Sequence, residues 1–382
     1  MTDPPALSPD ETTATESLLA RAWGTSVSVR AAEEIWGRSH ILRLRLADER
    51  TVMLKRHRTE NFGDRDRTFG NELAALELLN GMKRSVAPRL FGADSGTGIL
   101  LMQDLGPGSS LAHSLLDGDR DRASADLVSY ARALAAMHSW SIAEVTLAGR
   151  PAPALGEPEW MGAILRGKEP FLTVMAGLGL ATDGVGDDID RLVSLLRGTR
   201  ATGLVHSDPC PDNTHIVGGN CWLIDFETSG WGAVALDAAY LLTPFPSCWC
   251  FASLPPGATG AALRAYGQEV AAAGVDLGRD WDAVMTAALA GWLVARGKAL
   301  GEALDEDEDW GTTTMRPRLL TWLRSFVQSA DRSGALPFLR TLAAAARERL
   351  SARWPEALVP EYPAFAGPGA LVARNPEDWE SP

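Results

Sequence analysis

The sequence predicts an α+β protein with two lobes: an N-terminal antiparallel sheet with one main helix, then a mainly helical lobe. Strand patterns dominate before Gly106, where leucines alternate with arginines over residues 42–46. After Gly106 the apolar residues recur mostly at helical spacing, as they do over residues 127–138. The length of 382 residues is also more than one ordinary core needs. We therefore expect an N-terminal lobe over residues 1–106 and a C-terminal lobe over residues 107–382.

The N-terminal lobe should begin with a helix over about residues 9–23, because Ser8 can cap it and Glu11 completes a capping box. A polar stretch over residues 56–67 leads into the main helical run of this lobe. Four strands are expected, two before and two after that run, at residues 42–46, 52–55, 90–92 and 99–102.

The C-terminal lobe should be built from long helices, with one exception over residues 204–226, where two short apolar runs flank a loop of Asp, Pro and Asn. The apolar stretch 283–295 is too short to span a bilayer and is interpreted as part of a buried helix. The tail over residues 355–382 is rich in Pro and Ala and should lie irregularly over the surface. Later helices are expected at residues 261–273, 281–300, 318–329 and 338–352.

The charge of the chain restricts its partners. The 36 basic residues against 49 acidic ones give a net charge of −13. This sign opposes non-specific attraction to nucleic acid and to anionic membranes, and it suits a neutral or cationic substrate. We expect neither nucleic acid nor a membrane as a partner.

The cysteines indicate the compartment. All four lie between residues 210 and 250, and no second Cys pair or paired-histidine pattern completes a metal site with Cys248-Trp249-Cys250. We therefore expect buried free thiols and a reducing, cytoplasmic setting. Residues 1–5 show neither the basic region nor the apolar core of a signal peptide.

The strongest chemical signal is His-Ser-Asp-Pro-Cys-Pro-Asp-Asn over residues 206–213, followed by Trp-Leu-Ile-Asp-Phe-Glu over 222–227. Phosphoryl transfer needs a carboxylate that orients the attacking hydroxyl, and oxygen ligands for magnesium ions at the nucleotide phosphates. Asp208 fits the first task, while Asn213 and Asp225 fit the second. The alternative is a surface turn rich in Asp, Asn and Pro. The spaced Asp at the end of an apolar run favours the catalytic interpretation.

The N-terminal lobe offers an independent signal. A kinase-like site needs a lysine on a strand to hold the phosphates and a glutamate on the next helix to fix that lysine. Lys55 ends the strand pattern of residues 52–55, and Glu72 follows in the next helical run. Glu77 is the competing candidate for the pairing role.

These two segments, in this order, resemble the aminoglycoside phosphotransferase/choline kinase family, a branch of the protein-kinase-like fold, over roughly residues 25–300. The resemblance implies ATP or GTP as phosphoryl donor, Mg²⁺ as cofactor and a small-molecule hydroxyl as acceptor. It also implies that Asp208 is the catalytic base and that Asn213 and Asp225 are the metal ligands. By the same resemblance His206 braces the loop, and Asp237 packs beneath it.

The family's hinge resembles Leu-Met-Gln-Asp-Leu-Gly over residues 101–106, where Gln103 and Leu105 would contact the base of the nucleotide. The phosphate loop departs from the family pattern, because Trp-Gly-Arg-Ser-His over residues 36–40 has a single glycine. Ser39 is a candidate phosphate contact there, with a plain hairpin turn as the alternative. Ser207 is a second departure, since many relatives have glycine at this position.

Other functions compete with this prediction. A kinase of serine or threonine in a peptide would use the same base, and a pseudokinase would keep the fold without turnover. A metal-dependent hydrolase could use the aspartates but would not explain Lys55 or Glu72. The acceptor has no motif of its own. Six carboxylates within residues 302–309 form either a solvated acidic loop or a segment that attracts a cationic acceptor such as an amino sugar.

Overall fold

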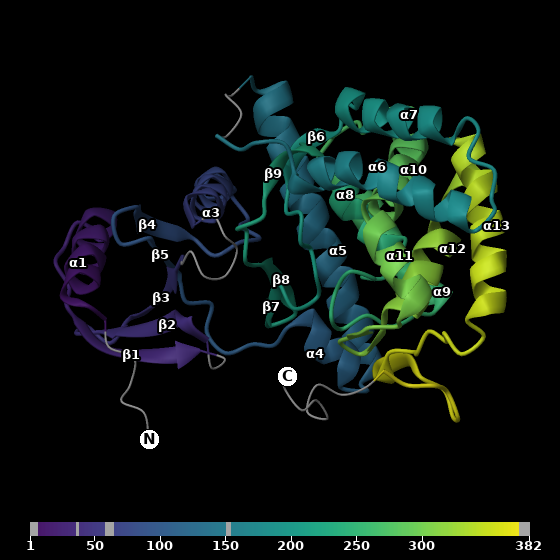
Figure 1. Cartoon of the computed structure of the whole chain (residues 1–382). Helices are drawn as coiled ribbons and strands as arrows, with labels where there is room; N and C mark the ends of the chain where they lie inside the picture. The colour runs from purple at the N-terminus through teal and green to yellow at the C-terminus, as the bar shows by residue number, and fades with distance from the viewer. Residues whose placement is uncertain (1–6, 36–37, 58–64, 150–153, 374–382) are drawn as a thin grey trace.

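The computed structural model describes residues 7–35, 38–57, 65–149 and 154–373, and Figure 1 shows a sheet-containing lobe on the left and a helical lobe on the right. The predicted fold class is therefore correct. Gly106 lies between the last strand of the N-terminal sheet, β5 (Ile99–Gln103), and α4 (Leu111–Leu116).

The N-terminal lobe contains a five-stranded antiparallel sheet in the order β1-β2-β3-β5-β4. All four predicted strands are present, and the prediction omitted β1. The seven residues of β1 lie at the sheet edge and are mostly exposed or half-buried, so they lack the apolar alternation of a half-buried strand. The remaining strands are β1 (Val29–Ile35), β2 (Arg38–Leu46), β3 (Thr51–Arg56) and β4 (Leu90–Asp94).

Two helices accompany this sheet. The helix α1 (Pro9–Trp23) begins with the predicted capping box, in which the Ser8 and Glu11 side chains each bond the other's backbone. Glu11 also pairs with Arg56 of β3 at 2.7 Å, which fixes α1 to the sheet. The helix α3 (Arg65–Leu79) already includes residues 65–67, so the predicted polar stretch is too long, and Glu72 lies inside the helix rather than at its start.

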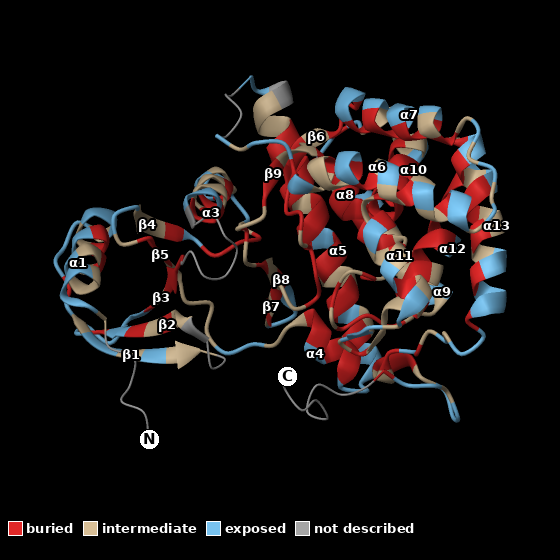
Figure 2. Cartoon of the chain, in the orientation of Figure 1, coloured by how far each residue is buried: buried red, intermediate tan, exposed pale blue. Residues whose placement is uncertain are grey.

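The C-terminal lobe is mainly helical, and α5, α10 and α12 are each largely buried along their length (Figure 2). The predicted helix over residues 281–300 is instead two helices bent by 48° at Arg296. The other three predicted helices are confirmed as α9, α12 and α13. The helices are α4, α5 (Arg120–Ile142), α6 (Glu159–Gly177), α7 (Val185–Gly198), α8 (Ala235–Ala238), α9 (Pro256–Ala272), α10 (Trp281–Ala295), α11 (Gly297–Asp305), α12 (Met315–Ser333) and α13 (Pro337–Arg353).

Three short antiparallel pairs interrupt these helices, and two of them frame the predicted catalytic segment. Residues 354–373 are mostly irregular, as expected for the described part of the tail. Among all the residues that the structure describes, no single helix is long and apolar enough to cross a membrane, although the bent pair α10–α11 reaches the required length and composition. The pairs are β6 (Thr202–Val205) with β9 (Gly230–Ala233), β7 (Thr214–Val217) with β8 (Asn220–Leu223), and β10 (Asp309–Trp310) with β11 (Thr313–Thr314).

Candidate active site

The predicted catalytic loop, residues 206–213, connects β6 to β7 and is held from below by Asp237. The buried Asp237 carboxylate accepts the backbone N–H groups of His206 at 2.6 Å and Ser207 at 3.0 Å. It also accepts a hydrogen bond from His138 Nε2 at 3.2 Å. His206 Nε2 donates to the carbonyl of Ile224 at 2.9 Å, which ties the loop to the segment that carries Asp225. Asp237 therefore lies where the resemblance placed it.

Ser207 is the strained residue of this loop. Its φ of 68° lies in the left-handed region that favours glycine. Its N–H is bonded to Asp237, and its carbonyl accepts from Trp160 Nε1 at 2.7 Å. Among the described residues its buried hydroxyl has no partner. The family's preference for glycine at this position thus has a backbone reason, and Asp237 and Trp160 hold the serine in the same conformation.

Asp208 lies between the loop backbone and Asn213. Asn213 Nδ2 donates to Asp208 Oδ2 at 2.8 Å and to the Asp208 carbonyl at 2.9 Å. Burial is the main cause that raises the pKa of Asp208 to about 6, and the charges of Asp212 and Asp225 add to it, against the opposing effects of His206 and Asn213. A carboxylate poised near neutral pH suits proton transfer.

Lys55 joins the two lobes. Its Nζ lies 2.6 Å from Glu72 Oε2 on α3, and 2.5 Å from Asp225 Oδ1 and 3.1 Å from Glu227 Oε2 in the C-terminal lobe. The exposed Glu77, the competing candidate, has no such contact. Burial opposes both charges, but the mutual attraction prevails: the pKa of Lys55 rises well above its ordinary value, and that of Glu72 falls to about 2.

Glu227 is a residue of this site that the sequence did not predict. Burial is the main cause that raises its pKa, and Asp225 and Glu72 act in the same direction. His57, Glu72 and Glu227 also form the one cluster of possible metal ligands in the described part of the chain. The Lys55 ammonium already contacts both carboxylates, so this cluster is better described as its counter-charge. The position of Glu227, directly after Asp225-Phe226, is the sequence feature that could have indicated its place in the site.

The predicted metal ligands lie on adjacent segments. The backbone N–H of Ile224 donates to the Asn213 carbonyl at 3.1 Å, which brings Asp225 alongside the end of the catalytic loop. The φ of Asp225 is 68°, a conformation rare for residues other than glycine. Carboxylate and amide oxygens at one place form a hard-oxygen donor set, which fits Mg²⁺.

The predicted hinge, residues 101–106, begins in the last three residues of β5 and continues into the turn after it. Asp104 accepts the Arg43 guanidinium at 2.8 Å and the Gly106 N–H at 3.0 Å, which fixes the turn between the lobes. Gln103 closes the sheet by donating its N–H to the Arg89 carbonyl at 2.8 Å, and Leu105 is half-buried. Trp36, Gly37 and the Ser39 side chain lie outside the described residues, so the role of Ser39 stays a prediction.

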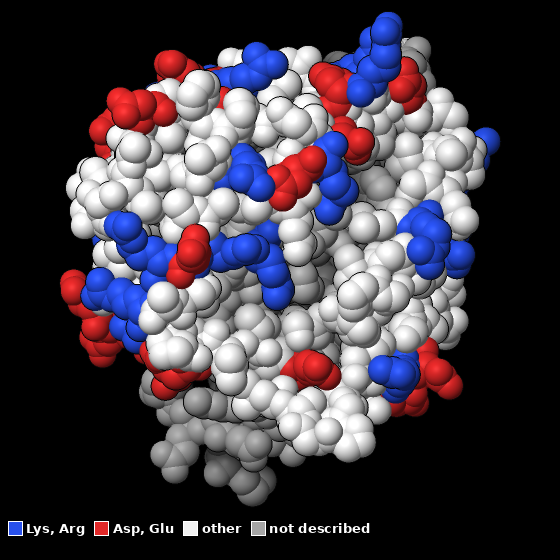
Figure 3. All heavy atoms as spheres, turned by 90° about the vertical axis from the view of Figure 1, so that its right-hand side faces the viewer, with Lys and Arg blue, Asp and Glu red and all other residues white. Residues whose placement is uncertain are grey.

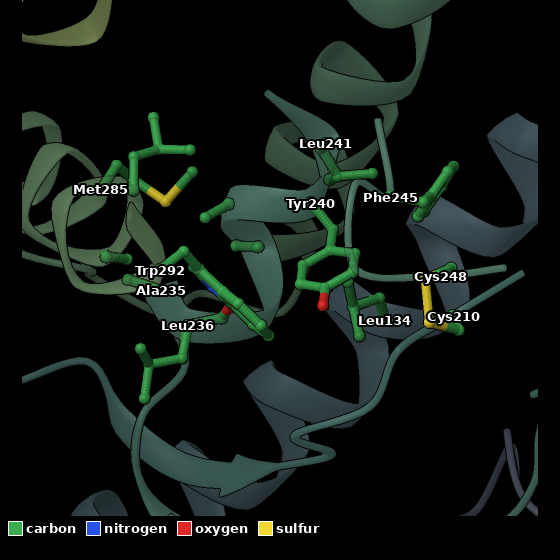
Figure 4. Close-up of a cluster of buried hydrophobic side chains, with 14 of the residues drawn as sticks. Leu134, Cys210, Ala235, Leu236, Tyr240, Leu241, Phe245, Cys248, Met285 and Trp292 are labelled. Carbon is green, nitrogen blue, oxygen red and sulfur yellow. A yellow bond between two sulfur atoms is a disulfide. The ribbon is translucent and has the colours of Figure 1, made fainter. Parts of the chain in front are cut away.

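The cysteine prediction was wrong for one pair. Cys210 of the catalytic loop and Cys248 form a disulfide, which Figure 4 shows together with the buried cluster around Tyr240 and Trp292. Cys221 and Cys250 are buried free thiols, as expected. The spacing of 38 residues gave no sign of the pairing, because it arises from long-range packing.

The segment around Cys248 is fixed a second time by Arg318, a buried residue of α12. Its guanidinium donates to backbone carbonyls, and burial lowers its pKa to about 9. The acceptors are the carbonyls of Pro246, Cys248, Trp249 and Trp310. Trp249 Nε1 also donates to Asp212 Oδ2 at 2.7 Å, so this segment contacts the catalytic loop directly.

The acidic run over residues 302–309 is largely exposed. Glu302 pairs with Lys298 one turn away, and Asp307 accepts the Arg316 N–H at the start of α12 at 2.9 Å. Figure 3 shows that Lys and Arg side chains also gather on the face of the helical lobe that is turned away from the N-terminal lobe. Local contacts therefore account for Glu302 and Asp307, and a role of this run toward substrate stays a prediction.

Comparisons with known proteins agree with this geometry. A family model described as the phosphotransferase enzyme family matches residues 35–285. A protein assigned to the aminoglycoside phosphotransferases from Ralstonia eutropha JMP134 has 16% identity and a TM-score of 0.49, covering 89% of this chain and 98% of that one. A choline/ethanolamine kinase family protein from Mesorhizobium loti has 14% identity and a TM-score of 0.41, covering 84% and 93%.

A third solved structure, amicoumacin kinase in complex with AMP-PNP, Ca²⁺ and Ami, has 14% identity and a TM-score of 0.46, covering 86% of this chain and 95% of that one. Comparison with curated proteins gives no match. The family model, which spans more than half of the chain, carries the assignment.

Proposed function

Because the chain belongs to the phosphotransferase enzyme family and is a phosphotransferase with an alcohol as acceptor, we propose that it moves the γ-phosphoryl group of ATP or GTP to a hydroxyl of a small molecule. Asp208 is the catalytic base in this proposal. Lys55 holds the nucleotide phosphates, with Glu72 fixing Lys55. Gln103 and Leu105 contact the base, and Ser39 is a further candidate at the phosphates.

The observation that supports this proposal best is the contact of Lys55 with Glu72 at 2.6 Å and with Asp225 at 2.5 Å. One ammonium on the N-terminal sheet thereby reaches the segment that follows the catalytic loop. A phosphate group at Lys55 would lie between the hinge-bearing lobe and the loop of Asp208. This is the arrangement that in-line transfer to a hydroxyl at Asp208 requires.

Asp208 would accept the proton of the acceptor hydroxyl as the oxygen attacks the γ-phosphorus. Its pKa of about 6 is still below neutral pH, so the carboxyl stays mostly ionised there, and the raised value makes it a stronger base than an ordinary aspartate. Asn213 and Asp225 would hold Mg²⁺, which when bound neutralises charge on the phosphates. Lys55 would contribute a second positive charge from the other lobe.

The alternatives keep less support. A pseudokinase commonly lacks one of the four polar residues, yet Lys55, Asp208, Asn213 and Asp225 are all present and lie on connected segments. A metal-dependent hydrolase leaves the contact between Lys55 and Glu72 without a role. A peptide kinase stays the competing function, and a panel that includes Ser- and Thr-containing peptides beside small hydroxyl compounds separates the two.

The base role is tested with Asp208→Asn. The amide keeps the size of the side chain but cannot accept the substrate proton, so transfer from radiolabelled ATP or GTP should fall by about a hundredfold or more. Nucleotide affinity should change little. Turnover within a fewfold of the wild-type value would remove Asp208 from the base role.

The metal roles are tested by comparing Asn213→Ala with Asp225→Ala. Asp225 carries a charge and Asn213 only a dipole, so excess Mg²⁺ should rescue nucleotide binding more readily in Asn213→Ala. Titration of nucleotide binding against Mg²⁺ measures this difference, and identical behaviour of both variants would contradict the assignment.

A cationic acceptor, such as an aminoglycoside, is also proposed, and the acidic run over residues 302–309 is its only support. Replacement of Asp305, Asp307 and Asp309 by Asn should then raise the acceptor KM in a salt-dependent way without changing kcat. A cytoplasmic setting is also proposed. The free thiols Cys221 and Cys250 support it, whereas the disulfide between Cys210 and Cys248 does not.

A further inference from the structure

Arg296 is a half-buried cation that has no ion-pair partner among the residues that the structure describes. It lies at the bend between α10 and α11, and its guanidinium carbon lies 4.9 Å from the ring centroid of Trp160 and 5.3 Å from that of Trp322. Within the described parts of the chain its side chain forms no hydrogen bond or ion pair, and its Nε is buried. A desolvated guanidinium without a partner costs free energy, so the arrangement suits a site that an anion completes.

The position of Arg296 is fixed by two glycines. A Cβ on Gly297 would lie 2.5 Å from Phe171 N, and one on Gly167 would lie 2.3 Å from the Val294 carbonyl oxygen. The backbones of α6 and of the α10–α11 bend are therefore in direct contact. This contact ends α10 at Ala295 and holds Arg296 at the corner, facing the α6 residue Trp160.

Trp160 connects Arg296 to the catalytic loop. Its Nε1 donates to the Ser207 carbonyl, directly before Asp208, at 2.7 Å, and its ring packs on Trp292 with centroids 3.9 Å apart. Burial lowers the pKa of Arg296, whereas the charges of Tyr240 and Asp208 act in the opposite direction.

We propose that Arg296, held between Trp160 and Trp322, binds an oxyanion of the acceptor, a carboxylate or a phosphate group, and so orients the acceptor hydroxyl toward Asp208. A guanidinium presents paired N–H donors that match an oxyanion, and the flat indole rings limit access of water to it. This inference rests on the proposed function, since it names the substrate class of the same site. It favours an anionic acceptor over the cationic one suggested by the exposed acidic run.

The first experiment measures binding by calorimetry with ADP and Mg²⁺ saturating the nucleotide site. The probes are D-gluconate with its neutral match D-glucitol, sn-glycerol 3-phosphate with its neutral match glycerol, and choline as the cation. The wild-type protein should bind one anionic probe at least about tenfold more tightly than its neutral match. The gluconate and glycerol phosphate arms tell a carboxylate from a phosphate.

The variants locate this preference. Arg296→Gln should abolish it, and Arg296→Lys should keep part of it, because lysine retains the charge but not the paired donors. Arg324→Gln is the matched control, since Arg324 lies on α12 two residues after Trp322 and is exposed. Equal wild-type affinities within both matched pairs, a preference for choline, or an unchanged preference in Arg296→Gln would each overturn the inference. The comparison of anionic with neutral probes in the wild-type protein tests the inference even if a variant fails to fold.

The second experiment repeats the panel as a transfer assay with radiolabelled ATP. For an anionic acceptor Arg296→Gln should raise KM about tenfold or more and leave kcat within a fewfold, whereas an effect on kcat alone would contradict anchoring of the acceptor. Asp208-dependent transfer only to choline or to neutral compounds would leave the proposed function standing and remove this inference. Arg296-dependent binding of an anionic probe without transfer to any hydroxyl would support the anion site at Arg296 and contradict the proposed phosphotransferase function.

Discussion

Asp237→Asn hardly changes the size of the side chain, but it should strongly disturb the catalytic loop. The carboxylate is buried and accepts the His206 and Ser207 backbone N–H groups on separate oxygens, with His138 as a third donor. In Asp237→Asn one oxygen can still accept, but the other becomes an NH₂ that faces a donor. The variant therefore loses a charge-assisted hydrogen bond and leaves a buried N–H unpaired.

These two losses together should lower the free energy of unfolding by about 3 kcal/mol. For a cooperative unit of about 270 residues, with an unfolding entropy of about 0.6 kcal/mol/K, this corresponds to a fall in Tm of about 5 °C. The loop that carries Asp208 also loses its anchor, so kcat should fall about tenfold to a hundredfold. Nucleotide affinity should stay within about threefold because Lys55, Glu72 and the hinge lie on the other lobe.

Thermal unfolding, nucleotide titration and steady-state kinetics check the three expectations separately. Asp126→Asn is the matched control: Asp126 is also a buried carboxylate of the helical lobe, and it accepts the Ser114 hydroxyl at 2.5 Å. It should lower Tm without lowering kcat. If Asp237→Asn kept the wild-type kcat while losing stability, Asp237 would be a packing residue and the loop would be positioned by other contacts.

Four further predictions concern residues of the same loop. Asp208 should produce an acid limb in the pH profile of kcat/KM near pH 6, because only its ionised form accepts a proton. Asp212→Asn should move that limb to lower pH, because the charge of Asp212 raises the pKa of Asp208. A limb that stays in place would contradict this effect of Asp212. The raised pKa also means that Asp208 favours folding below about pH 4 and that this contribution is lost as the pH rises through 6. Ser207→Gly should raise the free energy of unfolding in urea by about 1 kcal/mol by relieving the left-handed strain, and a loss of stability would show that the serine is held without strain. Reduction of the Cys210–Cys248 disulfide, which closes 38 residues, should lower that free energy by up to about 4 kcal/mol; Cys248→Ser should match the reduced protein and no longer respond to reductant.

The candidate site residues that the sequence singles out lie close together in the structure wherever the chemistry imposes residue types at fixed spacing. Asp208, Asn213 and Asp225 lie within one loop and the strand pair after it, so their proximity follows from local geometry. Lys55 and Glu72 are singled out because a kinase-like site needs a lysine on a strand for the phosphates and a glutamate on the next helix to fix that lysine. In each case the pattern spans few residues and one or two elements.

Features that depend on contacts between distant segments were missed. The pairing of Cys210 with Cys248 requires the catalytic loop and a later segment to meet, which no local pattern encodes. The apolar run of α10 continues smoothly into α11, so the bend at Arg296 has no periodic signal. It is the direct backbone contact at Gly167 and Gly297 that sets this corner, and neither glycine differs in sequence from one that merely weakens a helix.

The double fixation of the segment around Cys248 has a consequence for how such an enzyme changes its substrate. Arg318 bonds three backbone carbonyls of this segment as well as that of Trp310, and the disulfide links the same segment to the catalytic loop. A segment that is clamped by its backbone beside the catalytic loop cannot readily shift as a loop. Its side chains, in contrast, can be exchanged with little effect on the clamp, because none of these bonds involves them apart from the two cysteines. New acceptor preferences in descendants of this protein should therefore arise by point substitutions on a constant frame rather than by insertions or loop rearrangements.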